Sequence, residues 1–369
     1  MWTKPIINIL LILAIIALIV FSVITIKGFV RAQKITNEDD IQNVDVSILD
    51  LDKNYIRNFV KLDDEKYAIF LNIEPTEEKL ESSVAIYIYD NLKNEISSKY
   101  LAFDTEFLEF FSSDENGKMY VVEYTSNNAD EKIMQIDYEN MLILSEKKSK
   151  DISELLAHPN GEKIVYRSDN GLCISNTDFS NEKVLLKFEK GDSVQEDISY
   201  VPIQFISNNE LVYKKVGYEW SCGVGIYNIE TRQNKFIEKY DSEYLTGNDD
   251  EMYIFDSYVV YPIIKTSLND KNEEGTIVIQ ENNAQGGIIR ASDDGKKCFI
   301  EFYTNANESE NDIEHIYVYD LSNGKAINKH SYNVNPKTYD SIINAYFDNN
   351  DETIVYMTTT GLYKWNIGK

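Results

Sequence analysis

Short apolar segments alternate with polar turns over most of this chain. Seven times a turn rich in Asp, Asn and Gly leads at once into an apolar stretch with a period of two. Examples are the turn at residues 114–117 before the stretch at 119–122, and the turn at 159–161 before the stretch at 164–166. The 3.6-residue apolar period of a helix is absent from these segments. The pattern therefore predicts an all-β protein built from repeated strands.

The turns recur at a nearly constant spacing. The first begins at Asp63 and the seventh at Asp348, which gives about 48 residues per unit. One four-stranded propeller blade has roughly 40–50 residues. The third strand of most units ends in Asp or Asn, as at Asp90 and Asp320, where the side chain can start a tight turn. We predict a seven-bladed β-propeller, with six or eight blades as alternatives because the fifth unit (residues 243–282) is irregular.

The clearest copy of the repeat lies at residues 158–176. It reads His158-Pro159-Asn160-Gly161, followed by an Ile-Val-Tyr strand at 164–166 and a strand that ends in Asn176. This copy resembles the TolB-type, WD40-like propeller repeat, in which a Ser/His-Pro-Asp-Gly turn precedes a strand and then an Ile-Tyr-x-x-Asp strand. The resemblance covers about residues 54–369, although most copies lack the Pro-Asp-Gly core. It implies the fold but no particular activity, since related repeats serve binding modules and enzyme gates alike.

The last unit contains only three strand-like segments, at 342–347, 353–359 and 362–367. Residues 44–51 form a lone strand-like segment near the N-terminus and could supply the missing outer strand. Such closure would leave no open sheet edge. We therefore predict a propeller domain at residues 44–369, closed by strand 44–51.

The N-terminus has the composition of a membrane segment. Residues 6–26 carry no charge and, at ~1.5 Å per residue, span roughly 31 Å, close to the ~30 Å of a hydrocarbon core. This predicts one transmembrane helix between a short flank (1–5) and a tether (27–43). The alternatives are a cleaved signal peptide, whose apolar core is usually only ~7–15 residues long, and a buried helix.

The orientation of this anchor follows from two opposing signals. Lys27, Arg31 and Lys34 would keep the following residues in the cytoplasm, whereas long domains translocate largely regardless of flanking charge. We expect a single-pass signal anchor in the cell membrane with the propeller outside the cytoplasm.

The charge and cysteine content narrow the classes of partner. The chain has 62 acidic and 36 basic residues, a net charge of −26, whereas nucleic-acid binding needs clustered Lys and Arg. We therefore expect no nucleic-acid partner. Three cysteines are too few for a disulfide-rich scaffold. Cys173 and Cys298 fall in strands and should be buried, while Cys222, beside Gly223, should be exposed in a loop.

Motifs that carry chemistry are missing from the sequence. It contains no Gly-x-Ser-x-Gly elbow, no phosphate-binding glycine loop and no Cys-x-x-Cys or close His pair. His158 falls at its repeat's turn position. We therefore predict no catalytic residue, no cofactor, no metal and no enzymatic activity.

Two kinds of loop remain as candidate partner-binding sites. Tyr218 and Trp220 form an aromatic pair in one loop, and aromatic pairs of this kind either anchor ligands or pack over the mouth of a propeller. Long acidic loops suit a cationic partner or weak calcium binding, and simple solvation is the alternative. Their candidate residues are Glu77, Glu78, Glu308, Glu310 and Asp312.

These features together predict a non-catalytic module that binds a protein or cell-envelope partner. The alternative is a carbohydrate-active lyase or glycosidase that uses carboxylates in the propeller funnel, because composition alone leaves carboxylate-pair chemistry open.

Overall fold

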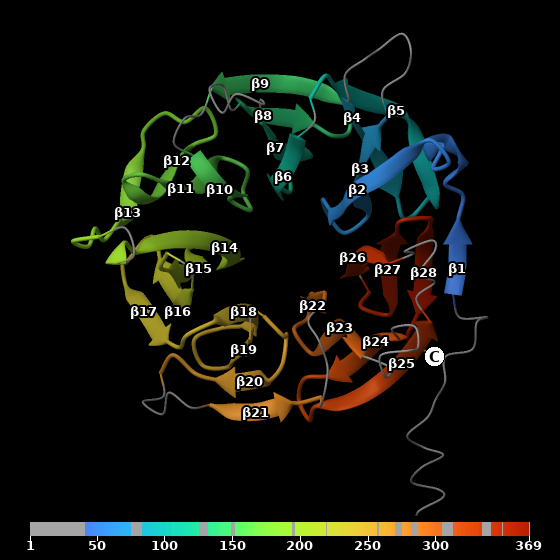
Figure 1. Cartoon of the computed structure of the whole chain (residues 1–369). Helices are drawn as coiled ribbons and strands as arrows, with labels where there is room; N and C mark the ends of the chain where they lie inside the picture. Colours follow the sequence, from blue (N-terminus) through green and yellow to red (C-terminus); the bar gives the residue numbers. More distant parts are fainter. Residues whose placement is uncertain are drawn as a thin grey trace, which may run out of the picture.

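The computed structural model is a ring of antiparallel β-sheets around a central axis (Figure 1). It describes residues 41–74, 83–105, 107–124, 132–148, 152–193, 196–218, 220–256, 258–269, 275–281, 287–304, 313–333, 341–348 and 350–368. Within these ranges the strands form seven four-stranded sheets. The prediction of an all-β, seven-bladed propeller is confirmed, and the irregular fifth unit forms a complete blade.

Blades 1 to 6 follow the chain in order, each built from four consecutive strands from the axis outward. Blade 1 contains β2 (Asn54–Lys61), β3 (Lys66–Ile73), β4 (Ser83–Asp90) and β5 (Glu95–Phe103); blade 2 contains β6 (Phe107–Ser113), β7 (Lys118–Tyr124), β8 (Lys132–Asp137) and β9 (Leu142–Lys148). Blade 3 contains β10 (Ile152–Ala157), β11 (Lys163–Ser168), β12 (Gly171–Asn176) and β13 (Lys183–Lys187); blade 4 contains β14 (Ser199–Ser207), β15 (Glu210–Val216), β16 (Ser221–Asn228) and β17 (Asn234–Glu238). Blade 5 contains β18 (Ser242–Gly247), β19 (Met252–Asp256), β20 (Ile263–Thr266) and β21 (Thr276–Ile279); blade 6 contains β22 (Ile289–Ala291), β23 (Lys297–Thr304), β24 (Ile313–Asp320) and β25 (Lys325–Asn333).

Blade 7 is built from both ends of the described chain. It contains β26 (Ile342–Phe347), β27 (Thr353–Thr358), β28 (Leu362–Asn366) and, as its outer strand, β1 (Ile41–Val44). The closing strand therefore begins three residues earlier than the predicted 44–51 and ends seven residues earlier, and it takes residues 41–43 from the predicted tether. The reason is local: Asp45 Oδ1 accepts a hydrogen bond from the Ser47 amide at 2.9 Å, and residues Ser47–Leu49 turn into a 3-10 helix.

The core lies between the blades rather than in one central mass. Each of the seven blade interfaces has its own cluster of buried apolar side chains. Between blades 1 and 2, for example, Phe70 and Ile86 share a cluster with Val121. The second and third strands of a blade pack against neighbouring blades on both faces. Their sequences are therefore continuous apolar runs, such as residues 67–71.

Polar residues at the strand ends form the turns that the repeat predicted. Asp63 Oδ1 accepts hydrogen bonds from the amides of Glu65 and Lys66 at 2.7 and 2.8 Å. Asp90 Oδ1 does the same for the Lys93 amide at 2.9 Å after a third strand. These turns, which join first to second and third to fourth strands, lie on one side of the ring, called here the turn face. The opposite side, the connection face, carries the loops between second and third strands and the links between blades.

The predicted membrane segment falls outside the described residues, as do the flank and most of the tether. Among the residues that the structure describes, no helix is long and apolar enough to span a membrane.

Candidate functional site

The aromatic pair predicted from the sequence lies on the connection face of blade 4. Tyr218 and Trp220 belong to the loop between β15 and β16, and their exposed fractions are 56% and 39%. The loop closes through a hydrogen bond from the Gly217 amide to the Trp220 carbonyl at 2.9 Å. The Trp220 ring packs close to the backbone of Gly217, because a Cβ at this residue would lie 2.8 Å from Cε2 of the ring. The loop thus holds the Trp220 ring against Gly217 and leaves Tyr218 exposed.

Two further exposed tyrosines lie in the segments next to this loop. Tyr240, in the link from blade 4 to blade 5, is 67% exposed, and Tyr258, between β19 and β20, is 66% exposed. The Asp241 amide donates to the Ser221 carbonyl at 2.9 Å, which places the link beside the Trp220 loop. In blade 5, Ser242 lies opposite Asp256 in the strand register, which places the same link beside the Tyr258 loop. We call Tyr218, Trp220, Tyr240 and Tyr258 the aromatic cluster.

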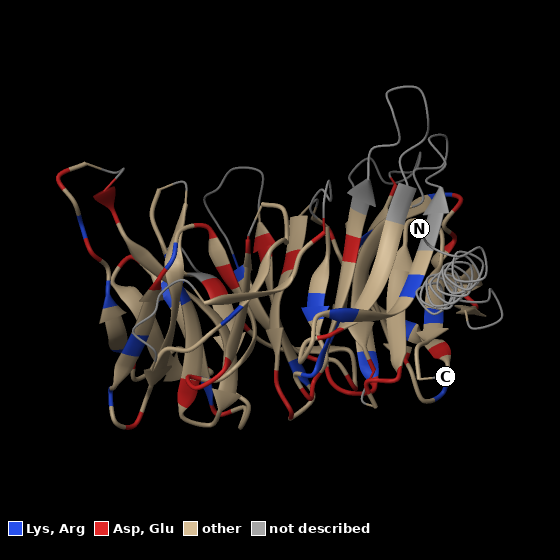
Figure 2. Cartoon of the chain, turned by 90° about the horizontal axis from the view of Figure 1, so that it is seen from below, with Lys and Arg blue, Asp and Glu red and all other residues tan. Residues whose placement is uncertain are grey.

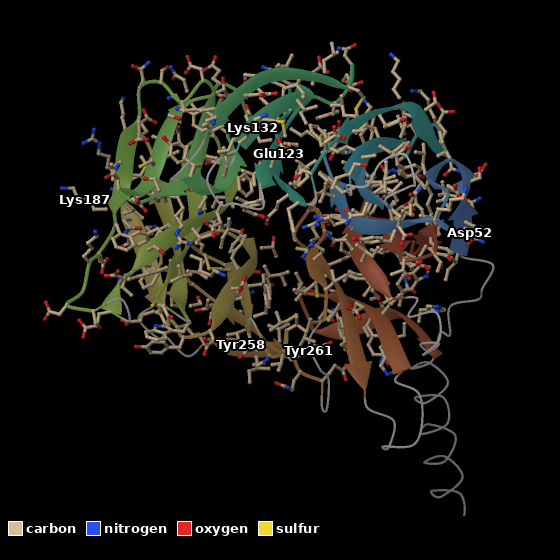
Figure 3. All side chains as sticks on the ribbon, turned by 45° about the horizontal axis from the view of Figure 1, so that its top comes forward. Asp52, Glu123, Lys132, Lys187, Tyr258 and Tyr261 are labelled. Atoms are coloured by element: carbon tan, nitrogen blue, oxygen red, sulfur yellow. The ribbon has the colours of Figure 1, made fainter. Side chains whose placement is uncertain are left out.

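An Asp-centred turn sets the position of Tyr258. Asp256 Oδ1 accepts hydrogen bonds from the amides of Tyr258 and Val259 at 2.9 and 3.2 Å. The turn directs Tyr258 outward, while Val260 and Tyr261 are buried against blades 5 and 6. Figure 3 labels Tyr258 beside Tyr261 at this edge of the ring.

The sequence did not reveal Tyr240 and Tyr258 as site residues. Each stands alone in its own loop, and only the strand register of blade 5 brings their segments together. A usable signal was present, because a single aromatic residue between charged neighbours, as at Lys239-Tyr240-Asp241, has no place in a buried strand.

The predicted acidic sites fall largely outside the described part of the chain; this holds for Glu77, Glu78, Glu308, Glu310 and Asp312. The described acidic link between blades 3 and 4 uses its carboxylates locally. Asp197 Oδ1 accepts a hydrogen bond from the Gly191 amide at 3.0 Å, and Glu196 Oε2 accepts one from the Asp192 amide at 3.0 Å. These two carboxylates therefore shape their own loop.

Acidic residues lie in several turns of the turn face, along the lower edge of the ring in Figure 2. A pocket of about 340 Å³ opens there between the turns of blades 1 to 3. Its acidic lining residues are Asp63, Asp64, Asp114 and Glu115. Burial raises the pKa of Asp114, although its Oδ1 accepts a hydrogen bond from the Asn116 amide at 2.8 Å. In the described ranges no three His, Cys, Asp or Glu side chains are grouped so that they could hold a metal ion.

Histidine and cysteine side chains in the described blades have structural surroundings. His158 is buried, its Nε2 lies 2.8 Å from the Asn208 carbonyl in the next blade, and its Nδ1 accepts a hydrogen bond from the Asn160 amide. The prediction that Cys222 is exposed is wrong, because β16 begins at Ser221 and Cys222 is buried like Cys173 and Cys298. Burial raises the pKa of the thiols of Cys173 and Cys298, which keeps them protonated.

Comparisons with solved structures show that the propellers of several peptidases have a similar fold. No protein-family model and no curated protein sequence matches the chain. The β-propeller domain of the Trilobed protease from Pyrococcus furiosus is similar with a TM-score of 0.53 and 14% identity, over 85% of this chain and 93% of that domain. A prolyl endopeptidase structure gives a TM-score of 0.60 and 11% identity, over 86% of this chain and 49% of the other. An acylaminoacyl peptidase from Pyrococcus horikoshii gives 0.51 and 11%, over 83% and 49%.

These identities show a shared fold. The chain spans about half the length of the prolyl endopeptidase and the acylaminoacyl peptidase, and nearly all of the Trilobed protease propeller domain. That domain is described as having an open velcro topology, whereas here β1 pairs with β28 and closes the ring.

The comparison corrects the predicted function. The similar structures belong to peptidases, so it does not support a non-catalytic binding module for a protein or cell-envelope ligand. It equally gives no support to a carbohydrate-active lyase or glycosidase. The prediction of no enzymatic activity is likewise not supported, because the structures with a similar propeller are peptidases. No residue pattern could have indicated this similarity, because the sequence contains no hydrolase motif.

Proposed function

We propose that the chain serves peptide hydrolysis as a peptidase-type propeller, which captures extended peptide segments on its connection face and presents them to a peptidase active site. The sequence contains no Gly-x-Ser-x-Gly elbow, so the hydrolytic group in this proposal belongs to another domain or chain. The shared fold with peptidase propellers supports the class of activity, and the aromatic cluster supports the role.

The aromatic cluster is the observation that carries this proposal. Rigid aromatic side chains lose little conformational entropy on binding and offer large contact areas, which is why they dominate binding hot spots. Here they stand on three neighbouring loop segments of blades 4 and 5 and are between 39% and 67% exposed. An extended peptide with proline or aromatic residues could lie across these rings, whereas a folded protein would expose few such side chains.

Peptide binding by the full-length chain tests the proposal. The probe is a fluorescein-labelled, unstructured peptide of about twelve residues that contains proline and leucine, and fluorescence anisotropy gives its affinity. We expect Trp220→Ala and Tyr240→Ala each to weaken binding about tenfold or more, the range of a hot-spot residue. The matched control is Tyr100→Ala, which removes a 50% exposed tyrosine from β5 on another blade and should leave the affinity unchanged.

Two results would contradict the proposal. One is an affinity that none of the cluster variants changes. The other is equal binding of the peptide and of a stably folded protein of similar composition, because capture for hydrolysis requires a preference for extended chains.

We also propose that residues 6–26 anchor the chain in a membrane with the propeller outside the cytoplasm, and that nucleic acid is not a partner. The uncharged segment at 6–26 and the net charge of −26 support this. Protease added to intact cells should digest the propeller, whereas digestion only after lysis would place it in the cytoplasm. The finer assignment of the repeat to the TolB type belongs to the same proposal, and the copy at residues 158–176 supports it.

A further inference from the structure

Two grooves occupy the same position at two different blade interfaces on the turn face. One, of about 420 Å³, lies between blades 1 and 2, and the other, of about 500 Å³, lies between blades 3 and 4. Each is formed by the beginning of a second strand, the end of a third strand, the beginning of a fourth strand and the turn that follows the third strand of the next blade.

Four lining residues of each groove occupy equivalent positions. Lys66 and Lys163 are the first residues of β3 and β11. Glu139 and Glu230 both stand two residues after the third strand of the neighbouring blade. Two residues further on come Met141 and Arg232, and both have a left-handed backbone, with φ of 54° and 59°. Glu95 and Lys183 are likewise the first residues of the fourth strands β5 and β13.

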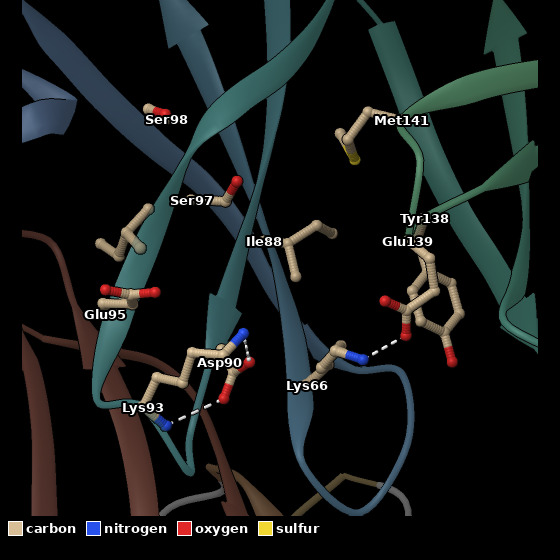
Figure 4. A pocket seen from close by; sticks show the side chains of 11 residues that line it. Lys66, Ile88, Asp90, Lys93, Glu95, Ser97, Ser98, Tyr138, Glu139 and Met141 are labelled. Atoms are coloured by element: carbon tan, nitrogen blue, oxygen red, sulfur yellow. Dashed lines mark hydrogen bonds and ion pairs between the residues drawn. The ribbon is translucent and has the colours of Figure 1, made fainter.

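In the groove between blades 1 and 2 the charges are paired (Figure 4). Lys66 Nζ forms an ion pair with Glu139, and Lys93 Nζ lies 2.8 Å from Asp90 Oδ2. Glu95 adds a third carboxylate to the lining. This groove therefore holds two cations and three carboxylates, with each cation neutralised by its own partner.

In the groove between blades 3 and 4 three cationic side chains have no ion-pair partner among the described residues. Lysine replaces Glu95 at position 183, and arginine replaces Met141 at position 232. Glu230 does not pair with Lys163 but accepts a hydrogen bond from Asn209 Nδ2 at 3.0 Å. Across the described residues no ion pair forms with Lys163, Lys183 or Arg232, and all three are exposed. Three cations thus face one carboxylate.

Apolar side chains form the floor of this second groove. Ile174 and Tyr227 are buried and Leu185 is half-buried, and all three line the cavity. A small inorganic anion would leave this floor in water. An occupant that matches the groove must therefore carry both negative charges and an apolar group.

We propose that the groove between blades 3 and 4 binds an acidic peptide segment. Its carboxylates pair with Lys163, Lys183 and Arg232, and an apolar side chain covers the floor. The net charge of −26 does not oppose a short segment, because screening at physiological salt limits electrostatic effects to about 8 Å and the nearest charges are these cations. A long nucleic acid would extend over the surrounding acidic surface and be repelled.

Anisotropy with the full-length chain tests this inference. The probe is a fluorescein-labelled peptide of about ten residues with alternating glutamate and leucine, and the control peptide has glutamine in place of glutamate. We expect one site per chain, binding of the glutamate peptide about tenfold or more tighter than the control, and weaker binding as NaCl rises from 0.05 to 0.5 M. Equal affinity for the two peptides, or no binding of either, would overturn the proposal.

The most informative variants replace residues of the groove between blades 3 and 4 with those at the equivalent positions of the groove between blades 1 and 2. Arg232→Met removes one cation and Lys183→Glu replaces a cation with a carboxylate, so each should weaken binding about two- to fivefold or more, and the double variant roughly tenfold. Lys93→Gln, at the other groove, is the matched control and should change nothing. Circular dichroism and the melting temperature show whether each variant is folded, and unchanged affinity in both folded variants would overturn the assignment.

Two competitors and one further variant separate the remaining explanations. Inorganic phosphate or single-stranded DNA that displaces the peptide at equal concentration would show a simple anion site and overturn the proposal. Trp220→Ala lies on the opposite face and should leave this affinity unchanged, so failure here is distinguishable from failure of the aromatic cluster.

The same reasoning allows a gain of binding. Glu95→Lys combined with Glu139→Gln gives the groove between blades 1 and 2 three cations against one carboxylate. Isothermal titration should then show two peptides per chain instead of one. A stoichiometry that stays at one would show that these charges do not define the ligand.

Discussion

Ile41 lies directly opposite Trp365 in the antiparallel ladder that closes the ring. The pairing continues through Gln42 with Lys364 to Val44 with Leu362, so β1 covers the outer edge of β28 from Leu362 to Trp365. Trp365 and Leu362 are each only 1% exposed. The last blade therefore depends on a strand more than 300 residues away in sequence, and this contact ties the two ends of the propeller together.

Loss of β1 should open the ring. A chain that begins at residue 45 keeps nearly all of the segment at 44–51 but lacks Ile41–Val44. We expect it to melt several degrees lower and to aggregate, because the edge of β28 is exposed and Val44 is removed from the core between blades 7 and 1. A chain that begins at residue 37 is the control. Equal melting temperatures would contradict closure by β1.

A glycine just after the aromatic loop should tolerate no side chain. Gly223 in β16 has φ +137°, and a Cβ there would lie 2.1 Å from the Ile237 carbonyl oxygen. Gly117 also has a positive φ, of +78°, but its Cβ would meet nothing closer than 3.4 Å. We expect Gly223→Ala to destabilise by about 3 kcal/mol or more, since backbone must move, and Gly117→Ala by about 1–2 kcal/mol from the left-handed backbone alone. Urea unfolding measures both, and equal losses would contradict the steric argument.

The propeller could be predicted because its signals are local. The carboxylate of Asp63 accepts hydrogen bonds from the backbone amides two and three residues on, so each turn is determined by residues that are close in sequence. The spacing of the turns can therefore be seen in the sequence. The candidate site could not be predicted from the sequence, because Tyr240 and Tyr258 become neighbours only through the pairing of Ser242 with Asp256 in the strand register. A glycine after Cys222 favours a loop in the sequence, yet Gly223 is a strand residue close to the backbone of β17. The N-terminal strand was displaced by one Asp-centred turn at Asp45.

The turn between β22 and β23 should contribute stability that acid removes. Partial burial alone would raise the pKa of Asp294, but hydrogen bonds from Lys296 and Ser292 lower it to about 2. Because the pKa of Asp294 is lower in the folded state, the stabilisation from its ionised carboxylate is complete above the ordinary pKa near 3.8. This stabilisation is lost as pH falls toward 2. Asp294→Asn should therefore reduce the free energy of unfolding at pH 7. The loss should be no more than about 1 kcal/mol, because the ion pair between Asp294 and Lys296 is solvent-exposed, and about half as much at pH 3.

Urea midpoints at the two pH values measure this difference, with the exposed Asp169→Asn as the control. A loss of equal size at pH 7 and pH 3 would show that the ionisation of Asp294 does not contribute.

The three thiols should be protected in the folded protein. Cys173 and Cys298 have no exposed surface and Cys222 has 7%, and burial raises the pKa of the first two. Since the thiolate is the reactive form, a disulfide reagent at pH 8 should label none of them within minutes, and all three in urea. Any labelling on a longer timescale should begin at Cys222, next to the aromatic loop. Fast native labelling of Cys298 would contradict the packing between blades 5 and 6.

Asp256 should position Tyr258 for peptide binding without contacting the peptide. Its Oδ1 holds the amides of Tyr258 and Val259, so Asp256→Ala frees the loop, whereas Asp256→Asn keeps an acceptor oxygen in the same place. We expect the alanine variant to bind the proline-containing peptide about three- to tenfold more weakly, with the asparagine variant close to the original chain. The melting temperature should fall by a few degrees at most, because one turn at the surface is affected. A purely structural role would lower the melting temperature of the alanine variant and leave the peptide affinity of the folded protein unchanged, and that outcome would remove Tyr258 from the proposed site.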